Sequence, residues 1–330
     1  MKILVTGATG FLGSAISRKL IEAGNDVKLL VRKSSDRSNT HGLKAEIVVG
    51  DLTEQSSLLR ACRGVEALYH VAADYRLWSK NKKQIYENNV TGTKNIMQAA
   101  LASDIGKIVY TSSVATLGTS AKNDFSNENT PVRFENMIGH YKRSKFLAEN
   151  VVQEMITTKG LPAVIVNPST PVGPRDIKPT PTGRIIRDAA LGKIPAYVNT
   201  GLNLAHVDDI ALGHLLAYEK GVIGRRYILG GENLSLRDIL LIVKKWSNQR
   251  ARLYKIPRVI VFPVAWISEL IAHLTNGPEP QVTLEGLRMS KNKMFFSSAR
   301  AAEELGYTWR NPKEGINDSL NWFRKVGYID

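Results

Sequence analysis

The chain has 330 residues, of which 43% are hydrophobic and 23% are charged, the composition of a globular protein with one large domain or a domain and a smaller lobe. Its single cysteine, Cys62, excludes an internal disulfide framework and a cysteine-cluster metal site, and the six histidines show no metal-ligand spacing, so we expect no metal. The 45 basic residues exceed the 30 acidic ones, and this excess of positive charge favours anionic ligands in general. Nucleic acid and an anionic membrane surface are the more specific alternatives.

The first thirteen residues predict a nucleotide-binding loop. An apolar strand begins at Lys2, which leaves no room for a cleavable leader and favours a cytoplasmic protein. The strand runs directly into a helix that includes Phe11 and Leu12, and the turn carries the glycines Gly7, Gly10 and Gly13. Strand, glycine turn and helix in this order bind a dinucleotide pyrophosphate, because the N–H groups at a helix start have no internal partner.

The first half of the chain alternates strand-like and helix-like segments. Long helices are expected over residues 84–103 and 137–158, and the apolar strands over residues 3–5, 27–31, 47–49, 67–71, 108–111 and 163–166. Such βα units predict an α/β fold with a doubly wound parallel sheet, the NAD(P)-binding Rossmann fold. We assign residues 1–166 to this domain, with the sheet completed near 204–230, and residues 167–330 mainly to a smaller, mostly helical substrate lobe.

The end of the second predicted strand bears on the choice of cofactor. An NAD site places a carboxylate there, whereas this chain has Arg32, followed by Lys33. A guanidinium can pair with the 2′-phosphate of NADP and stack on adenine. NADP(H) is therefore favoured, and Asp36 keeps NAD(H) as the alternative.

Two predicted elements supply groups for proton transfer. Tyr141 and Lys145 are four residues apart in the predicted helix and share one face. A lysine ammonium and a nicotinamide cation would lower the pKa of the tyrosine towards neutrality. Ser112 and Ser113 follow the strand that ends at Thr111, where a hydroxyl can hold the substrate oxygen.

A basic segment precedes the most apolar stretch of the chain. No acidic residue lies between Asp238 and Glu269, and the basic residues run directly into residues 259–274. Residues 244–274 could therefore form a peripheral contact with a membrane. A buried helix of the substrate lobe beside a phosphate-binding patch explains the same pattern.

These motifs occur in the order found in extended short-chain dehydrogenases/reductases, the NAD-dependent epimerase/dehydratase family. The chain resembles its dihydroflavonol-reductase-like branch and, more closely, the hopanoid-associated sugar epimerases of bacteria. The resemblance rests on the glycine loop, the serine pair and the Tyr141–Lys145 motif, together with the segments 51–52, 70–78, 88–93, 139–149 and 167–176.

The resemblance implies a role for each matching residue. Tyr141 would be the general acid–base, and Lys145 would bind the nicotinamide ribose. Ser113 would contact the reacting oxygen, with Ser112 as the alternative. The other implied contacts are Asp51 and Leu52 with adenine, Ala72 and Ala73 with the pyrophosphate and ribose, Asn88 with the helix that carries the catalytic pair, Pro168 and Ser169 with the nicotinamide, and Asn167 with the substrate.

The expected function is hydride transfer by an NAD(P)-dependent epimerase or oxidoreductase. Its substrate would be a small-molecule sugar, nucleotide sugar or lipid-linked sugar, and the resemblance implies a place in hopanoid lipid synthesis at the inner membrane. A dihydroflavonol-reductase-like carbonyl reductase is the alternative. A non-catalytic NADP-binding, sensing or nucleic-acid-binding protein is the alternative from another class. Related enzymes pair through the two long helices, so a homodimer is expected.

Overall fold

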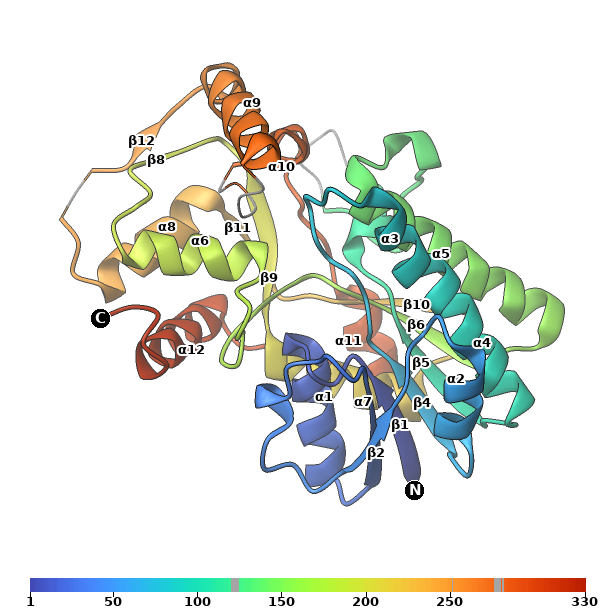
Figure 1. Cartoon of the computed structure of the whole chain (residues 1–330). Helices are drawn as coiled ribbons and strands as arrows, with labels where there is room; N and C mark the ends of the chain where they lie inside the picture. Colours follow the sequence, from blue (N-terminus) through green and yellow to red (C-terminus); the bar gives the residue numbers. More distant parts are fainter. Residues whose placement is uncertain (120–124, 251, 276–279, 281) are drawn as a thin grey trace.

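Seven parallel strands form the main sheet of the protein (Figure 1). The computed structural model describes residues 1–119, 125–250, 252–275, 280 and 282–330. The strand order is β10-β6-β5-β4-β1-β2-β3. The strands are β1 (Lys2–Thr6), β2 (Asp26–Val31), β3 (Glu46–Val49), β4 (Ala67–His70), β5 (Lys107–Thr111), β6 (Ala163–Pro168) and β10 (Arg226–Leu229). The order reverses between β1 and β4, where a doubly wound sheet binds its ligand at the carboxyl ends of the strands.

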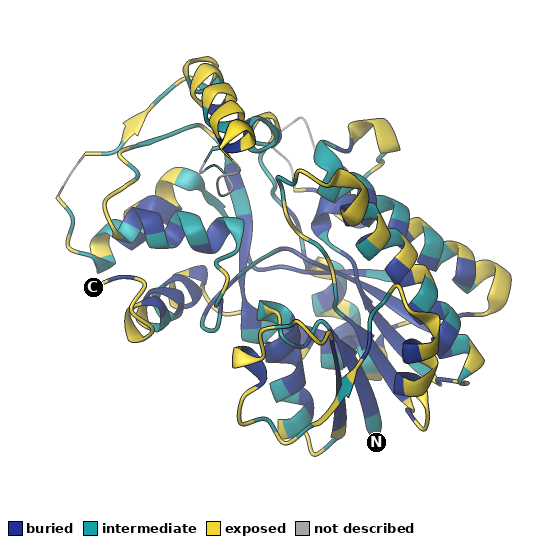
Figure 2. Cartoon of the chain, viewed as in Figure 1, coloured by how far each residue is buried: buried dark blue, intermediate teal, exposed yellow. Residues whose placement is uncertain are grey.

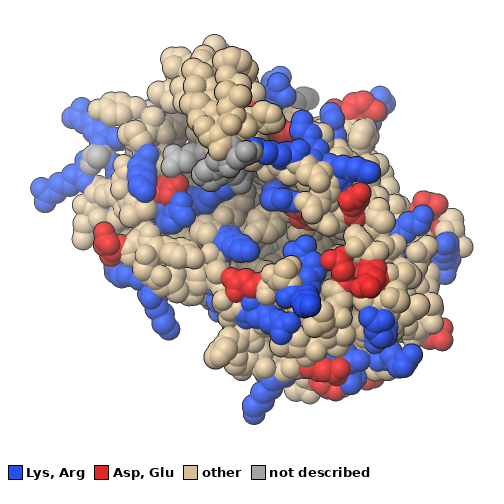
Figure 3. All heavy atoms as spheres, in the orientation of Figure 1, with Lys and Arg blue, Asp and Glu red and all other residues tan. Residues whose placement is uncertain are grey.

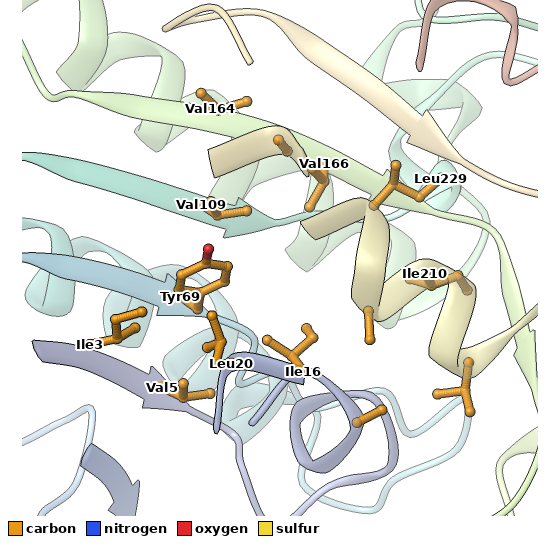
Figure 4. Close-up of a cluster of buried hydrophobic side chains, with 14 of the residues drawn as sticks. Ile3, Val5, Ile16, Leu20, Tyr69, Val109, Val164, Val166, Ile210 and Leu229 are labelled. Carbon is orange, nitrogen blue, oxygen red and sulfur yellow. The ribbon is translucent and has the colours of Figure 1, made fainter. Parts of the chain in front are cut away.

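Helices cover both faces of this sheet, which confirms the predicted Rossmann fold. One face packs against α1 (Phe11–Glu22), α7 (Val207–Lys220) and α11 (Ala299–Leu305), and the other against α2 (Gln55–Cys62), α4 (Gly92–Ala102) and α5 (Gly139–Lys159). Alternate side chains of each strand enter opposite cores: Ile3 and Val5 pack with Ile16 and Leu20 of α1 (Figure 4), whereas Leu4 faces the other helices. Burial on both faces explains why the strands are almost wholly apolar.

The two long predicted helices are present with small shifts. The first runs from Lys82 to Ala102 through α3 (Lys82–Tyr86), a π-helical turn (Glu87–Thr91) and α4. The second is α5, which ends at Gly160 in the left-handed conformation. Short 3₁₀ turns occupy residues Ser38–Thr40, Val114–Thr116 and Phe134–Asn136.

A smaller lobe packs beside the carboxyl edge of the sheet (Figure 1). Its core joins α6 (Pro181–Ala190), α8 (Leu236–Trp246) and α12 (Pro312–Lys325). The other elements are α9 (Arg258–Leu274), α10 (Leu284–Met289), β7 (Thr170–Val172), β8 (Ala196–Tyr197), β9 (Gly201–His206), β11 (Glu232–Ser235) and β12 (Tyr254–Lys255). The four shortest of these strands were not predicted, because β8 and β12 have only two residues and β7 and β11 lack an apolar run.

We expected residues near 204–230 to complete the main sheet, and only one of the two strands in this range does so. β10 is its edge strand and pairs with β6. β9 instead forms a separate sheet, with β7 parallel on one side and β11 antiparallel on the other. Both edges of β9 are therefore paired away from the main sheet. The division of the chain at residue 166 stays a prediction. Two helices from the second half, α7 and α11, pack on the main sheet and not in the smaller lobe.

Candidate active site

The glycine loop lies directly against the chain that leaves β4. Gly7 has φ +71°, and a Cβ there would lie 2.6 Å from the backbone nitrogen of Ala72. A Cβ on Gly13 would lie 2.1 Å from the carbonyl oxygen of Gly7. Both positions therefore require glycine, because any side chain would collide with fixed backbone. Ala72, expected beside the cofactor pyrophosphate, is thereby placed next to the loop.

The start of α1 can receive an anion. Its N-cap is Gly10, which makes no side-chain hydrogen bond to the first turn, and that turn contains no acidic residue. Phe11 and Leu12 are the first two residues of the helix and are half-buried. The uncapped N–H groups and the positive end of the helix dipole are suited to a pyrophosphate.

A buried histidine, His70, helps to hold this loop in place, and the sequence did not predict this role. His70 Nδ1 lies 2.7 Å from Thr6 Oγ1, and its Nε2 lies 3.0 Å from Thr93 Oγ1. Thr6 Oγ1 also accepts a hydrogen bond from the backbone N–H of Ala72 at 3.2 Å. Burial, and to a smaller extent the charge of Lys145, lowers the pKa of His70 to about 3, so the ring is neutral. Its hydrogen bond with Thr6 joins the ends of β1 and β4.

Tyr141 and Lys145 lie in the first turns of α5, close to the end of β5. Lys145 is only 2% exposed, and its Nζ donates to the carbonyl oxygen of Thr111 at 2.9 Å and to the hydroxyl of Tyr110 at 3.4 Å. Ser113 is close enough to Tyr141 for its side chain to lower the pKa of that tyrosine. The helix, the strand end and the following loop thus bring the three expected catalytic residues together.

Burial shifts both titrating groups of this cluster towards their neutral forms. It raises the pKa of Tyr141, and the side chain of Ser113 opposes that change. It lowers the pKa of Lys145 to about 8, against the attraction of Glu149. In the protein itself the pKa of Tyr141 is therefore raised, not lowered as the sequence led us to expect from Lys145.

The two serines of the pair have different surroundings. Ser112 is buried and its hydroxyl donates to Glu149 Oε2, which also accepts from Thr116 Oγ1 at 2.9 Å and from Asn167 Nδ2 at 3.0 Å. Asn167 Nδ2 donates as well to the carbonyl oxygen of Ser113 at 3.1 Å. This buried network holds the loop that carries Ser113, which is itself half-buried.

The support expected from Asn88 for the catalytic helix comes instead from its neighbour. Asn89 Nδ2 donates to Ser144 Oγ of α5 at 2.9 Å, and its Oδ1 accepts from the backbone N–H of Asp74 at 2.7 Å. Asn88 Nδ2 donates to Asp74 Oδ2 at 3.1 Å. The resemblance implied this role for Asn88, whereas in the structure Asn89 of the same π-helical turn makes the contact with α5.

At the end of β2, Arg32 is exposed. The carboxylate of Asp36 is engaged locally, with Oδ1 accepting from the backbone N–H of Ser38 at 3.0 Å and from its hydroxyl at 2.5 Å. Burial raises the pKa of Asp51, but hydrogen bonds from Thr53 and the charge of Arg32 outweigh it, so the pKa is lowered overall. Asp51 is therefore a carboxylate close to a guanidinium.

The other expected contacts lie at the same edge of the sheet. Leu52 accepts a hydrogen bond on its carbonyl oxygen from Asn95 Nδ2 at 2.9 Å, and Ala73 is exposed in the loop after β4. Pro168 ends β6, and Ser169 follows it. The hydroxyl of Ser169 and Oδ1 of Asn167 are buried without a hydrogen-bond partner. Unpaired buried polar atoms are rare in proteins, and a polar ligand such as a carboxamide would satisfy them.

The model of the NAD dependent epimerase/dehydratase family matches residues 3–230. The chain belongs to this family. It is 42% identical to a putative dihydroflavonol 4-reductase of Synechocystis over 98% of this chain and 95% of that protein. It is 31% identical to sterol demethylase protein B of Methylococcus capsulatus over 100% of both. The crystal structure of gox2253 is similar over 99% of both chains, with a TM-score of 0.89 and 51% identity.

Family membership makes the chain an NAD(P)-dependent enzyme of the oxidoreductase and epimerase type. The resemblance to the extended short-chain dehydrogenases/reductases is thereby confirmed. The glycine positions that a Cβ would block and the unpaired polar atoms of Asn167 and Ser169 fit a bound dinucleotide. Within the described part of the chain, no helix is both long and apolar enough to cross a bilayer.

Proposed function

We propose that the chain catalyses NADP(H)-dependent hydride transfer at a carbon that carries a hydroxyl or a carbonyl group. The observation that carries this proposal is the cluster of Tyr141, Lys145 and Ser113 at the same carboxyl edge of the sheet as the glycine loop. A binding module has no physical need for a buried lysine of lowered pKa one turn from a half-buried tyrosine.

The proton chemistry falls to the side chains of this cluster. In the oxidative direction, the substrate C–H bond breaks as hydride leaves and the hydroxyl proton passes to the deprotonated oxygen of Tyr141; in reduction the Tyr141 hydroxyl returns the proton as hydride is delivered. When bound, the nicotinamide donates or accepts the hydride. Ser113 holds the substrate oxygen, and Lys145 holds the ribose and the tyrosine in place. Ser112 donates to Glu149, which supports Ser113 rather than Ser112 as the serine that contacts substrate.

Charge at the end of β2 supports NADP(H) over NAD(H). The exposed Arg32 can pair with a 2′-phosphate. Asp36, the carboxylate that could have received ribose hydroxyls, is engaged with Ser38. We infer that Asp51 and Leu52 meet the adenine, that Ala72 and Ala73 line the pyrophosphate and ribose, and that Pro168 and Ser169 meet the nicotinamide.

The substrate we propose is a sugar or a lipid-linked sugar, with a place in hopanoid synthesis suggested by the sequence resemblance. Release after one transfer would make the enzyme a reductase, and return of hydride to the other face of the keto form would make it an epimerase. The relatives described as reductases favour the first outcome. Asn167 is fully buried with its Nδ2 engaged, so only its Oδ1 would reach a ligand.

The test combines binding and turnover. Titration with NADPH and NADH should show tighter binding of NADPH, and a screen of sugars and ketones with labelled NADPH should show hydride exchange. Tyr141→Phe should retain NADPH binding and lose turnover by roughly 10²-fold or more. Full turnover in that variant, or hydride exchange with no dependence on Tyr141, would refute the mechanism.

A further inference from the structure

The helix α9 presents its apolar side chains to solvent. Its exposed residues include Val259 at 77%, Leu274 at 72%, Ile260 at 62% and Trp266 at 57%. Figure 2 shows most of this helix in the colour of exposed residues. The exposed apolar side chains of α9 are Val259, Ile260, Val264, Trp266, Ile267, Leu270, Ile271 and Leu274. At 100° per residue they occupy one continuous face.

The side of α9 that faces the protein is the narrower one, and it carries half-buried Val261 and Phe262 together with small and polar residues. Ala265 and Ala272 are its buried residues. Glu269 Oε1 accepts a hydrogen bond from the backbone N–H of Leu284 at the start of α10 at 2.7 Å. A surface helix of a globular protein normally buries its apolar stripe. In α9 the wider apolar stripe faces solvent instead, and a contiguous exposed apolar face marks a docking surface.

Positive charge lies immediately before this helix. Lys244, Lys245, Arg250 and Arg252 line an open surface hollow of about 810 Å³, with no acidic residue in its lining. The short strand β12 connects this hollow to α9. In Figure 3 the surface of α9 is almost entirely uncharged, and Lys and Arg side chains lie beside it. These four cations form no ion pair with any other described residue.

We propose that α9 and this basic hollow dock the enzyme on an anionic membrane surface. The apolar face of α9 enters the boundary between headgroups and acyl chains, and the cations of the hollow contact lipid phosphates. The 17 residues of α9 lie in the plane of the interface. A second copy of the chain fits less well, because a two-fold contact through this face would bring two basic hollows towards each other.

Docking through α9 would bring the catalytic helix close to the lipid. Glu285 of α10 lies against Gly139, where a Cβ would be 2.3 Å from its Oε2, and Gly139 is two residues before Tyr141. A lipid-linked substrate could then reach the site from the membrane surface. This consequence, unlike the docking itself, depends on the function proposed above.

Flotation with vesicles tests the docking without any turnover. The whole protein should float at low salt with phosphatidylcholine vesicles that contain phosphatidylglycerol, and much less with phosphatidylcholine alone. The triple variant Ile260→Ser, Ile267→Ser, Ile271→Ser should reduce binding by at least about tenfold. The variant Lys244→Ala, Lys245→Ala should lose most of the preference for anionic vesicles.

A matched control removes equally exposed apolar side chains elsewhere. Val222→Ser with Ile223→Ser changes two residues that are each 52% exposed, and this variant should float like the unmodified protein. Circular dichroism checks that every variant is folded, and replacing exposed residues should leave it so. The proposal is overturned if the unmodified protein stays in the soluble fraction, or if the control loses as much binding as the α9 variant. It is also overturned if the α9 variant dissociates a dimer while vesicle binding is unchanged.

Discussion

Replacement of Lys145 by methionine should change how stability depends on pH. The ammonium is 2% exposed, and burial lowers its pKa from 10.5 to about 8. Between these two pH values the unfolded chain binds more protons than the folded one, so the free energy of unfolding rises with pH. The destabilisation caused by burying the Lys145 ammonium is present in full below pH 8 and is lost by pH 10.5. It amounts to about 3 kcal/mol.

At neutral pH the methionine variant gains by losing this buried charge but leaves the Thr111 carbonyl oxygen without its 2.9 Å donor. That loss is about 1–3 kcal/mol, so the two effects nearly cancel. The clear signal is the pH slope. Relative to the variant, the unmodified protein should gain about 3 kcal/mol from neutral pH to pH 10.5.

Urea unfolding followed by circular dichroism at several pH values measures this difference. Other titrating groups contribute equally to both proteins and cancel. Lys159→Met is the matched control, because Lys159 is an exposed lysine at the end of the same helix, and it should leave the pH slope unchanged. Parallel pH profiles for the unmodified protein and Lys145→Met would refute the argument that Lys145 is held partly neutral by burial.

Four further substitutions test separate parts of the site. Arg32→Ala should weaken NADPH binding by about tenfold to a hundredfold in calorimetric titration, with NADH binding unchanged; an equal loss for both would contradict the 2′-phosphate contact. Ser113→Ala should lower kcat and cost about 0.5–2 kcal/mol of stability, because its hydroxyl accepts from the Ala115 N–H at 3.1 Å. Ser112→Ala should cost about 1–3 kcal/mol of stability in urea unfolding, because a buried donor to Glu149 is lost. Gly13→Ala should abolish cofactor binding, given a Cβ 2.1 Å from a backbone oxygen; retention of normal affinity would refute the packing argument.

The parts of the molecule that the sequence predicted well depend on local chemistry. The run from Lys2 to Gly13 specifies strand, turn and helix within one short window, and the alternation of Ile3, Leu4 and Val5 between two cores follows from burial on both faces. The four-residue spacing of Tyr141 and Lys145 needs only an uninterrupted helix, which α5 provides. These features are set by neighbouring residues, and a pattern along the chain can express them.

The features that the sequence did not yield depend on contacts between distant segments. His70 has an unremarkable position at a strand end, and its role follows from Thr6 and Thr93, which other elements bring to it. The resemblance pointed to Asn88, and only the contact of Asn89 with Ser144 across the fold shows which of the two neighbouring asparagines reaches α5.

The helix α9 shows the same limit most clearly. Its apolar stretch was readable in the sequence, and so was the basic segment before it, but both a buried helix and a membrane contact agreed with that pattern. Only the partners of Glu269 and the burial of Ala265 and Ala272 tell which side faces the protein. Hydrophobicity along a chain gives the width of an apolar face, whereas its direction is decided by the tertiary contacts of the opposite face.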